Sequence, residues 1–187
     1  MKLKKLNAAL GLLSIAFLLA HVVYSVVSYL TFYYNPAITT ALSLPFLVLV
    51  CLHAVAGMLR VFLLPDGTRA DLYPKQNMGT ILQRVSAALI LPLLILHTRS
   101  FSIMQSSAES GNTPLIALVM LVEVLYFAVV ITHVATSFTK GLITLGFLSS
   151  PQTQAKLDRV VYKLCAICFA VAVYAVTSTR IAMFFAG

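Results

Sequence analysis

Residues 115–138 read LIALVMLVEVLYFAVVITHVATSF, an apolar stretch interrupted by one glutamate, one histidine and a few hydroxyl residues. An α-helix rises 1.5 Å per residue, so a helix over this stretch alone measures about 36 Å, more than the about 30 Å of a hydrocarbon core. The stretch therefore predicts a transmembrane helix, within a longer apolar run over about residues 114–148.

Similar apolar runs precede and follow this one in the sequence, over about residues 6–33, 41–64, 79–103 and 158–186. The breaks between the runs carry turn residues, namely Asn35-Pro36, Pro65-Asp66-Gly67, Gly111–Pro114 and Ser149–Pro151. Backbone polar groups must bond within the segment in lipid, so each run is expected to be helical. We predict an all-α membrane protein, a single domain over residues 1–187 folded as a five-transmembrane-helix bundle.

Composition supports a membrane protein over a soluble one. Hydrophobic residues make up 60% of the chain and charged residues only 10%, too few to cover a soluble domain of this size. The net charge of +8 does not indicate nucleic-acid binding, because the basic residues flank apolar runs rather than forming a basic patch. The first run is too long for a signal peptide and is interpreted as a retained span.

The basic residues also predict an orientation. With the N-terminus in the cytoplasm and the C-terminus outside, eleven Lys and Arg residues fall on the cytoplasmic side and two outside. The cytoplasmic set is Lys2, Lys4, Lys5, Arg60, Arg69, Lys75, Arg84, Lys140, Lys156, Arg159 and Lys163, and the outer set is Arg99 and Arg180.

The four histidines of the chain fall one in each of the first four runs, as His21, His53, His97 and His133. A single buried histidine is compatible with a packing role, but ionisable groups in lipid are costly and usually functional. His21 and His97 follow the nearest cytoplasmic basic residue by 16 and 13 residues, a rise of about 20–24 Å. His53 and His133 each precede a cytoplasmic basic residue by seven residues, a rise of about 10 Å.

The histidines therefore form two levels, an outer pair (His21 and His97) and an inner pair (His53 and His133). Two levels of two imidazoles inside a helical bundle predict two bis-histidine b-type haems. Zinc would require three or four ligands at one point, and a histidine proton relay remains as an alternative. Arg60 and Lys140, each seven residues after an inner ligand, are candidates for the inner haem propionates or for simple membrane anchors.

These residues resemble a known family, the cytochrome b558-type membrane anchor subunit of succinate dehydrogenases and fumarate reductases, in its five-helix, di-haem class. The resemblance covers nearly the whole chain. It rests on residues 82–86 (LQRVS) followed by His97, residues 53–57 (HAVAG), residues 6–11 (LNAALG) before His21, and His133 with the loop at 150–154 (SPQTQ). In that family the same four helices supply the ligands with the same pairing.

The resemblance implies a role in electron transfer. A flavoprotein subunit and an iron–sulfur subunit would bind the cytoplasmic face, and electrons would pass through two haem b groups to menaquinone near the outer haem. The chain would be non-catalytic alone, a subunit of a succinate:quinone oxidoreductase in the bacterial cytoplasmic membrane. Two alternatives are a di-haem cytochrome b subunit of another quinone-linked dehydrogenase and a haem-free transporter or channel.

Some positions depart from the family pattern or lack a fixed role. Family members with a compensating proton pathway carry a glutamate two residues before the fourth ligand, where this chain has Ile131. Glu123 is the only acid deep in a run, so we expect it either to take part in quinone-linked proton transfer or to bond a neighbouring helix. Gln83, Arg84 and Ser86 are candidates for quinone binding or, preferably, for an inner-haem propionate or subunit-docking role.

Overall fold

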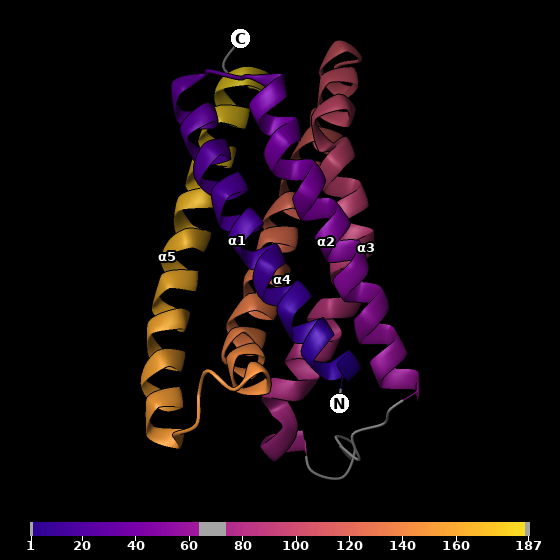
Figure 1. Ribbon diagram of the computed structural model, residues 1–187. Coiled ribbons are helices and arrows are strands. Elements are labelled where there is room, and N and C mark those ends of the chain that lie inside the picture. Colours follow the sequence, from indigo (N-terminus) through magenta and orange to yellow (C-terminus); the bar gives the residue numbers. More distant parts are fainter. Residues whose placement is uncertain (1, 64–73, 186–187) are drawn as a thin grey trace.

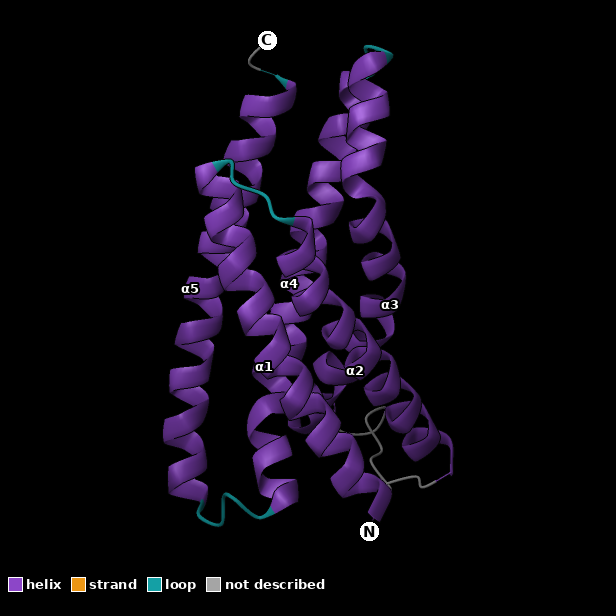
Figure 2. Cartoon of the chain, turned by 45° about the horizontal axis from the view of Figure 1, so that its top comes forward, coloured by secondary structure: helices purple, strands orange, loops and turns teal. Residues whose placement is uncertain are grey.

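The computed structural model describes residues 2–63 and 74–185, and these form five long α-helices without a strand (Figure 2). The helices are α1 (Lys2–Thr31), α2 (Pro36–Leu63), α3 (Pro74–Glu109), α4 (Thr113–Leu145) and α5 (Pro151–Phe184). All five are long and apolar enough to cross a membrane. The prediction of an all-helical, multi-pass membrane protein is therefore confirmed.

The helices form an up-and-down bundle in which the two termini lie at opposite ends (Figure 1). The helix α1 packs on α2, α4 and α5, and α4 packs on α1, α3 and α5. Among the described helices, α2 has extensive backbone contact only with α1. Side chains of α1, α2 and α4 can therefore meet in the interior, although the backbone of α2 does not pack closely on α3 or α4.

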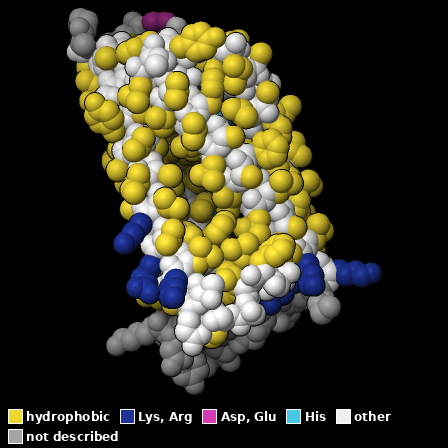
Figure 3. All heavy atoms as spheres, turned by 60° about the vertical axis from the view of Figure 1, so that its left-hand side comes forward, with side chains coloured by type: hydrophobic (Ala, Val, Ile, Leu, Met, Phe, Trp, Pro, Cys, Tyr) yellow, Lys and Arg dark blue, Asp and Glu magenta, His cyan; other side chains and the backbone are white. Residues whose placement is uncertain are grey.

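Large apolar side chains cover the outside of the bundle (Figure 3). Val23, Ile95, Leu121 and Ile167, from four different helices, are each 60% or more exposed. An apolar surface of this extent is untenable in water, whereas lipid chains match it. The interior is small, with apolar clusters around Leu94, Tyr126 and Val130 and around Ala135, Val161 and Cys165.

Several helices extend beyond the predicted apolar runs by a turn or more. The helix α2 begins at Pro36 rather than near residue 41, because proline suits the first helical position and Asn35 caps the helix. The Asn35 side-chain oxygen accepts hydrogen bonds from the backbone N–H groups of Ala37 (3.0 Å) and Ile38 (3.3 Å). Before it, Phe32 takes a left-handed conformation (φ 53°), which ends α1 at Thr31.

The other helices also differ from the apolar runs. The helix α3 continues past residue 103 to Glu109, α4 ends at Leu145 rather than near 148, and α5 begins at Pro151 rather than near 158. Residues 151–154, predicted as part of a loop, form the first turn of α5, which is capped by the hydroxyl of Ser150. Gly146 ends α4 in the left-handed conformation (φ 90°) that glycine adopts without strain.

Most of the described basic residues gather at one end of the bundle. Lys2, Lys4, Lys5, Lys156, Arg159 and Lys163 lie in the first turns of α1 and α5, Arg60 in the last turn of α2 and Lys140 near the end of α4. Figure 3 shows Lys and Arg side chains at one end of the visible face and an acidic side chain at the other. The predicted turn at 65–67 and Arg69 lie outside the described residues, as does the side chain of Lys75.

Candidate functional site

Two of the four histidines face each other inside the bundle. His53 on α2 and His133 on α4 have ring centroids 6.1 Å apart, with ring planes inclined by 68°. Two imidazoles that bind one metal atom from opposite sides, each through a bond of about 2 Å, place their centroids about 6 Å apart. The structure therefore brings together the two residues of the predicted inner pair at a separation that suits a shared metal.

The His53 ring is held by α1. Its Nδ1 lies 3.0 Å from the backbone oxygen of Asn7, to which a protonated Nδ1 donates a hydrogen bond. Gly11 packs directly on the same ring, since a Cβ built on Gly11 would lie 2.9 Å from Cε1 and 3.1 Å from Nδ1 of His53. The stretch 6–11 therefore fixes the position of a histidine 46 residues away from Asn7.

The His133 ring is held by α3. Its Nδ1 lies 3.2 Å from the backbone oxygen of Gln83 and 3.2 Å from the hydroxyl oxygen of Ser86. The Ser86 hydroxyl donates to the backbone oxygen of Leu82 (2.6 Å), so its oxygen remains able to accept from His133. Gln83 and Ser86, predicted at either a quinone or an inner-haem site, thus lie against the inner histidine.

Both inner histidines are arranged as residues that could hold a haem iron would be. A ligating histidine usually binds the metal through one ring nitrogen while the other donates to a carbonyl or carboxylate, which fixes the tautomer. Here the carbonyl groups of Asn7 and Gln83 engage Nδ1 of His53 and His133, so Nε2 of each is the nitrogen that would be left to bind a metal. No group of three or more His, Cys, Asp or Glu residues that could hold a metal ion converges within the described ranges.

The predicted outer pair is arranged differently. The His21 ring stacks on Phe46 (centroids 6.3 Å, planes 9° apart), and the His97 ring stacks on Tyr126 (4.7 Å, 24°). No ring contact joins His21 to His97 in the part of the chain that the structure describes. Nδ1 of each is buried without a hydrogen-bond partner there. The outer pairing remains a prediction.

The candidate propionate partners lie near the inner histidines at the basic end. The ammonium of Lys140 donates to the side-chain oxygen of Gln83 (3.0 Å) and to the backbone oxygen of Gly79 (3.4 Å). Gln83 therefore contacts both His133 and Lys140. Arg60 is half-buried in the last turn of α2, and Arg84 is exposed on α3. Lys140 is thus tied to an inner histidine through a shared partner.

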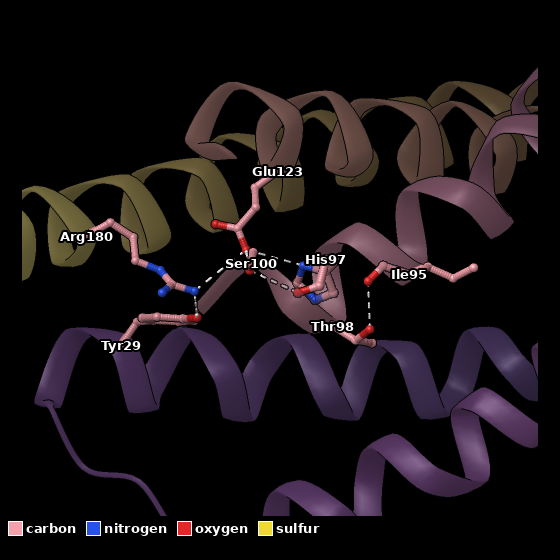
Figure 4. A network of polar contacts seen from close by, with 7 residues as sticks. All are labelled: Tyr29, Ile95, His97, Thr98, Ser100, Glu123 and Arg180. Carbon is pink, nitrogen blue, oxygen red and sulfur yellow. Dashed lines mark hydrogen bonds and ion pairs between the residues drawn. The ribbon is translucent and has the colours of Figure 1, made fainter. Parts of the chain in front are cut away.

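A buried polar network joins four helices toward the other end of the bundle (Figure 4). Ser100 on α3 donates a hydrogen bond to Oε1 of Glu123 on α4 (2.5 Å). The guanidinium of Arg180 on α5 lies 3.6 Å from the same oxygen and donates to the phenol oxygen of Tyr29 on α1 (3.0 Å). Glu123, Arg180 and Ser100 are each only 2% exposed.

The network is only partly satisfied. Oε2 of Glu123 and both Nε and Nη1 of Arg180 are buried without a hydrogen-bond partner among the described residues. The guanidinium also lies over the rings of Tyr29 and Phe101, 5.5 and 5.1 Å from their centroids. Buried charged groups with unsatisfied atoms are very costly. The Glu123–Arg180 pair therefore indicates either a function or a further polar group that bonds to it.

Sequence reasoning missed Arg180, Ser100 and Tyr29 as members of this network. It identified Glu123 as a deep acid but counted Arg180 only as an outer flanking charge. The available signal was its position, because residues 181–186 continue the apolar run beyond Arg180. A charge inside a run, rather than after it, indicates an interior partner.

A small apolar pocket lies beside the network, between α3 and α4. Its volume is about 260 Å³, and Ser100 and Glu123 are the polar residues in its wall. The rest of the wall is formed by Leu96, Ile103, Leu115, Leu118, Val119 and Val122.

Comparison with known proteins identifies no relative. No protein-family model, no curated protein and no solved structure matches the chain.

Proposed function

We propose that the chain is a di-haem cytochrome b that anchors a succinate dehydrogenase or fumarate reductase type complex in the bacterial cytoplasmic membrane. In this proposal it carries electrons between an iron–sulfur subunit and a membrane quinone. The resemblance of the sequence motifs is the basis for the proposed family, and the geometry of the inner histidines supports the proposed cofactor. Haem b, when bound, supplies one-electron redox chemistry without an open coordination site.

The observation that carries the proposal is the pair formed by His53 and His133. Their centroid separation of 6.1 Å suits two ligands of one iron, and each Nδ1 faces a backbone carbonyl. Lys140, joined to His133 through Gln83, would then neutralise a propionate of the inner haem.

The polar network supports a quinone site toward the end of the bundle opposite the basic residues. The pocket beside Glu123 and Ser100 has an almost wholly apolar surface, which suits a ring with an isoprenoid tail. Glu123 lies 3.5 Å from Nδ1 of His97, so this pocket adjoins a predicted outer ligand. Menaquinone is the quinone that the family resemblance implies.

The basic end would face the cytoplasm and receive the iron–sulfur and flavoprotein subunits. The first turns of α1 and α5 and the last turns of α2 and α4 meet there, with most of the described Lys and Arg residues. The inner haem would lie on this side, within reach of a docked iron–sulfur centre.

Haem quantification on the purified complex tests the proposal. We expect two b-type haems per chain and loss of one haem in the His53→Ala and His133→Ala variants. Thr136→Ala is a matched control, because Thr136 lies one turn from His133 and bonds only to backbone oxygens of its own helix. A purified chain without haem, or full haem content in both histidine variants, would contradict the proposal.

The identity of the partners tests the family separately. Purification from native membranes in mild detergent should yield a flavoprotein and an iron–sulfur protein together with this chain. Turnover of succinate or fumarate by that assembly distinguishes the proposed complex from a di-haem cytochrome b of another dehydrogenase.

A further inference from the structure

The surroundings of His97 differ from those of the inner histidines. Nδ1 of His53 and His133 face neutral backbone carbonyls, at 3.0 and 3.2 Å. Nδ1 of His97 instead lies 3.5 Å from Oε1 of Glu123, and it has no hydrogen-bond partner among the described residues. The nearest acceptor recorded for this nitrogen is therefore a carboxylate.

The carboxylate of Glu123 is held in place from two other helices. The Ser100 hydroxyl donates to Oε1 at 2.5 Å from α3, and the Arg180 guanidinium lies 3.6 Å away on α5. Arg180 is itself fixed by the phenol of Tyr29 on α1. Figure 4 shows Glu123 between Arg180 on one side and His97 on the other, with Ser100 beneath. The arrangement gives the buried carboxylate a countercharge and a defined direction.

We propose that Glu123 is a positioning residue for the outer haem ligand, which accepts the Nδ1 proton of His97 and lowers the reduction potential of the haem that His97 would bind. A carboxylate acceptor increases the electron donation of an imidazole ligand more than a neutral carbonyl does. Stronger donation stabilises ferric over ferrous iron. This inference rests on the proposed di-haem function.

Redox titration of the purified, quinone-depleted complex, followed by haem absorption and by electron paramagnetic resonance (EPR) of the ferric haems, tests the inference. In Glu123→Gln we expect the ratio of reduced to oxidised outer haem at a fixed potential to rise about tenfold, as expected for loss of one charge-assisted hydrogen bond. The inner haem of the same molecule is the internal control and should not change. The EPR g-values of the outer haem alone should shift.

Two further variants separate hydrogen bonding from charge. Glu123→Asp keeps the charge but withdraws the oxygens by one methylene, so it should also alter the outer-haem g-values. The double variant Glu123→Gln/Arg180→Met removes both charges of the pair, so its net charge is unchanged. It should retain the shift of Glu123→Gln, and it also avoids leaving Arg180 unpaired if the single variant fails to fold.

Asp158→Asn is the matched control. Asp158 is the other described acid that bonds across helices, to the hydroxyl of Thr139 at the basic end (2.7 Å), and its loss should leave the outer haem unchanged. The inference is overturned if Glu123→Gln and the double variant leave both haem potentials and g-values at their wild-type values. It is equally overturned if Glu123→Asp is indistinguishable from wild type. Absence of haem from the wild-type chain would instead refute the proposed function.

Discussion

Gly11 shows how a single hydrogen atom in place of a side chain determines the position of a ligand. A Cβ at this position would lie 2.9 Å from the His53 ring, closer than carbon atoms approach without displacement. The clash is with the ring itself rather than with the end of a flexible chain. The ring is also held by Asn7, so it cannot move without losing that hydrogen bond.

We therefore expect Gly11→Ala to displace the His53 ring and to weaken or abolish binding of the inner haem. Haem content of the purified protein and the EPR signal of the inner haem measure the effect. Gly79→Ala is the matched control, because a Cβ there would meet no atom of the described residues within 4 Å. Equal haem content in the two variants would show that Gly11 does not position the ligand.

The residue-scale features divide into those that sequence predicts and those that it does not. The depth of His53 and His133 follows from counting residues to Arg60 and Lys140, and the structure brings these two rings together from separate helices in an edge-on contact. The partners of each ring do not follow from counting, because Asn7 and Gln83 lie on other helices whose rotation depends on packing.

At the scale of helices, the apolar runs located all five helices, but the ends of the helices differ from the ends of the runs. A run of apolar residues stops at the first polar cluster, whereas a helix can continue through one. In α3, Ser102, Ser106 and Ser107 lie beyond or near the end of the apolar run, and each donates to a backbone oxygen three or four residues earlier, so their hydroxyl groups are satisfied within the helix. In α2, the hydroxyl of Thr39 bonds to the Asn35 oxygen in the same way.

The helix α5 is joined to the bundle by polar contacts near both of its ends. Arg180 and Thr179 bond to Tyr29 at one end, and Asp158 bonds to Thr139 at the other. Arg180→Met would leave the Glu123 carboxylate buried without its countercharge. Removal of one partner of a buried ion pair costs about 3–5 kcal/mol.

We expect Arg180→Met to lower the melting temperature of the detergent-solubilised protein, measured by circular dichroism. The double variant Glu123→Gln/Arg180→Met should recover most of the loss, because neither charge remains unpaired. A single variant as stable as wild type, or a double variant less stable than both singles, would show that the pair does not stabilise the docking of α5.

At the scale of the molecule, the bundle has an apolar belt and a marked charge asymmetry, both of which composition and spacing predicted. The structure places the described basic clusters of α1, α2, α4 and α5 at one end, because in an up-and-down bundle the starts of α1, α3 and α5 lie on the same side as the ends of α2 and α4. The Gly111 turn lies at the opposite end, between α3 and α4. The proposed electron path depends on which end faces the cytoplasm.

Positive residues are retained in the cytoplasm during insertion, so we expect the basic end to be cytoplasmic and the α3–α4 turn to be outside. The measurement uses a chain in which Cys51, Cys165 and Cys168 are replaced by alanine and one cysteine is introduced at an exposed loop position, as Ser110→Cys or Ser149→Cys. A membrane-impermeant maleimide applied to intact spheroplasts should label Ser110→Cys, and Ser149→Cys only after permeabilisation. The opposite pattern would place the inner histidine pair on the outer side, where a cytoplasmic iron–sulfur subunit would not reach it, and would contradict the proposed direction of docking.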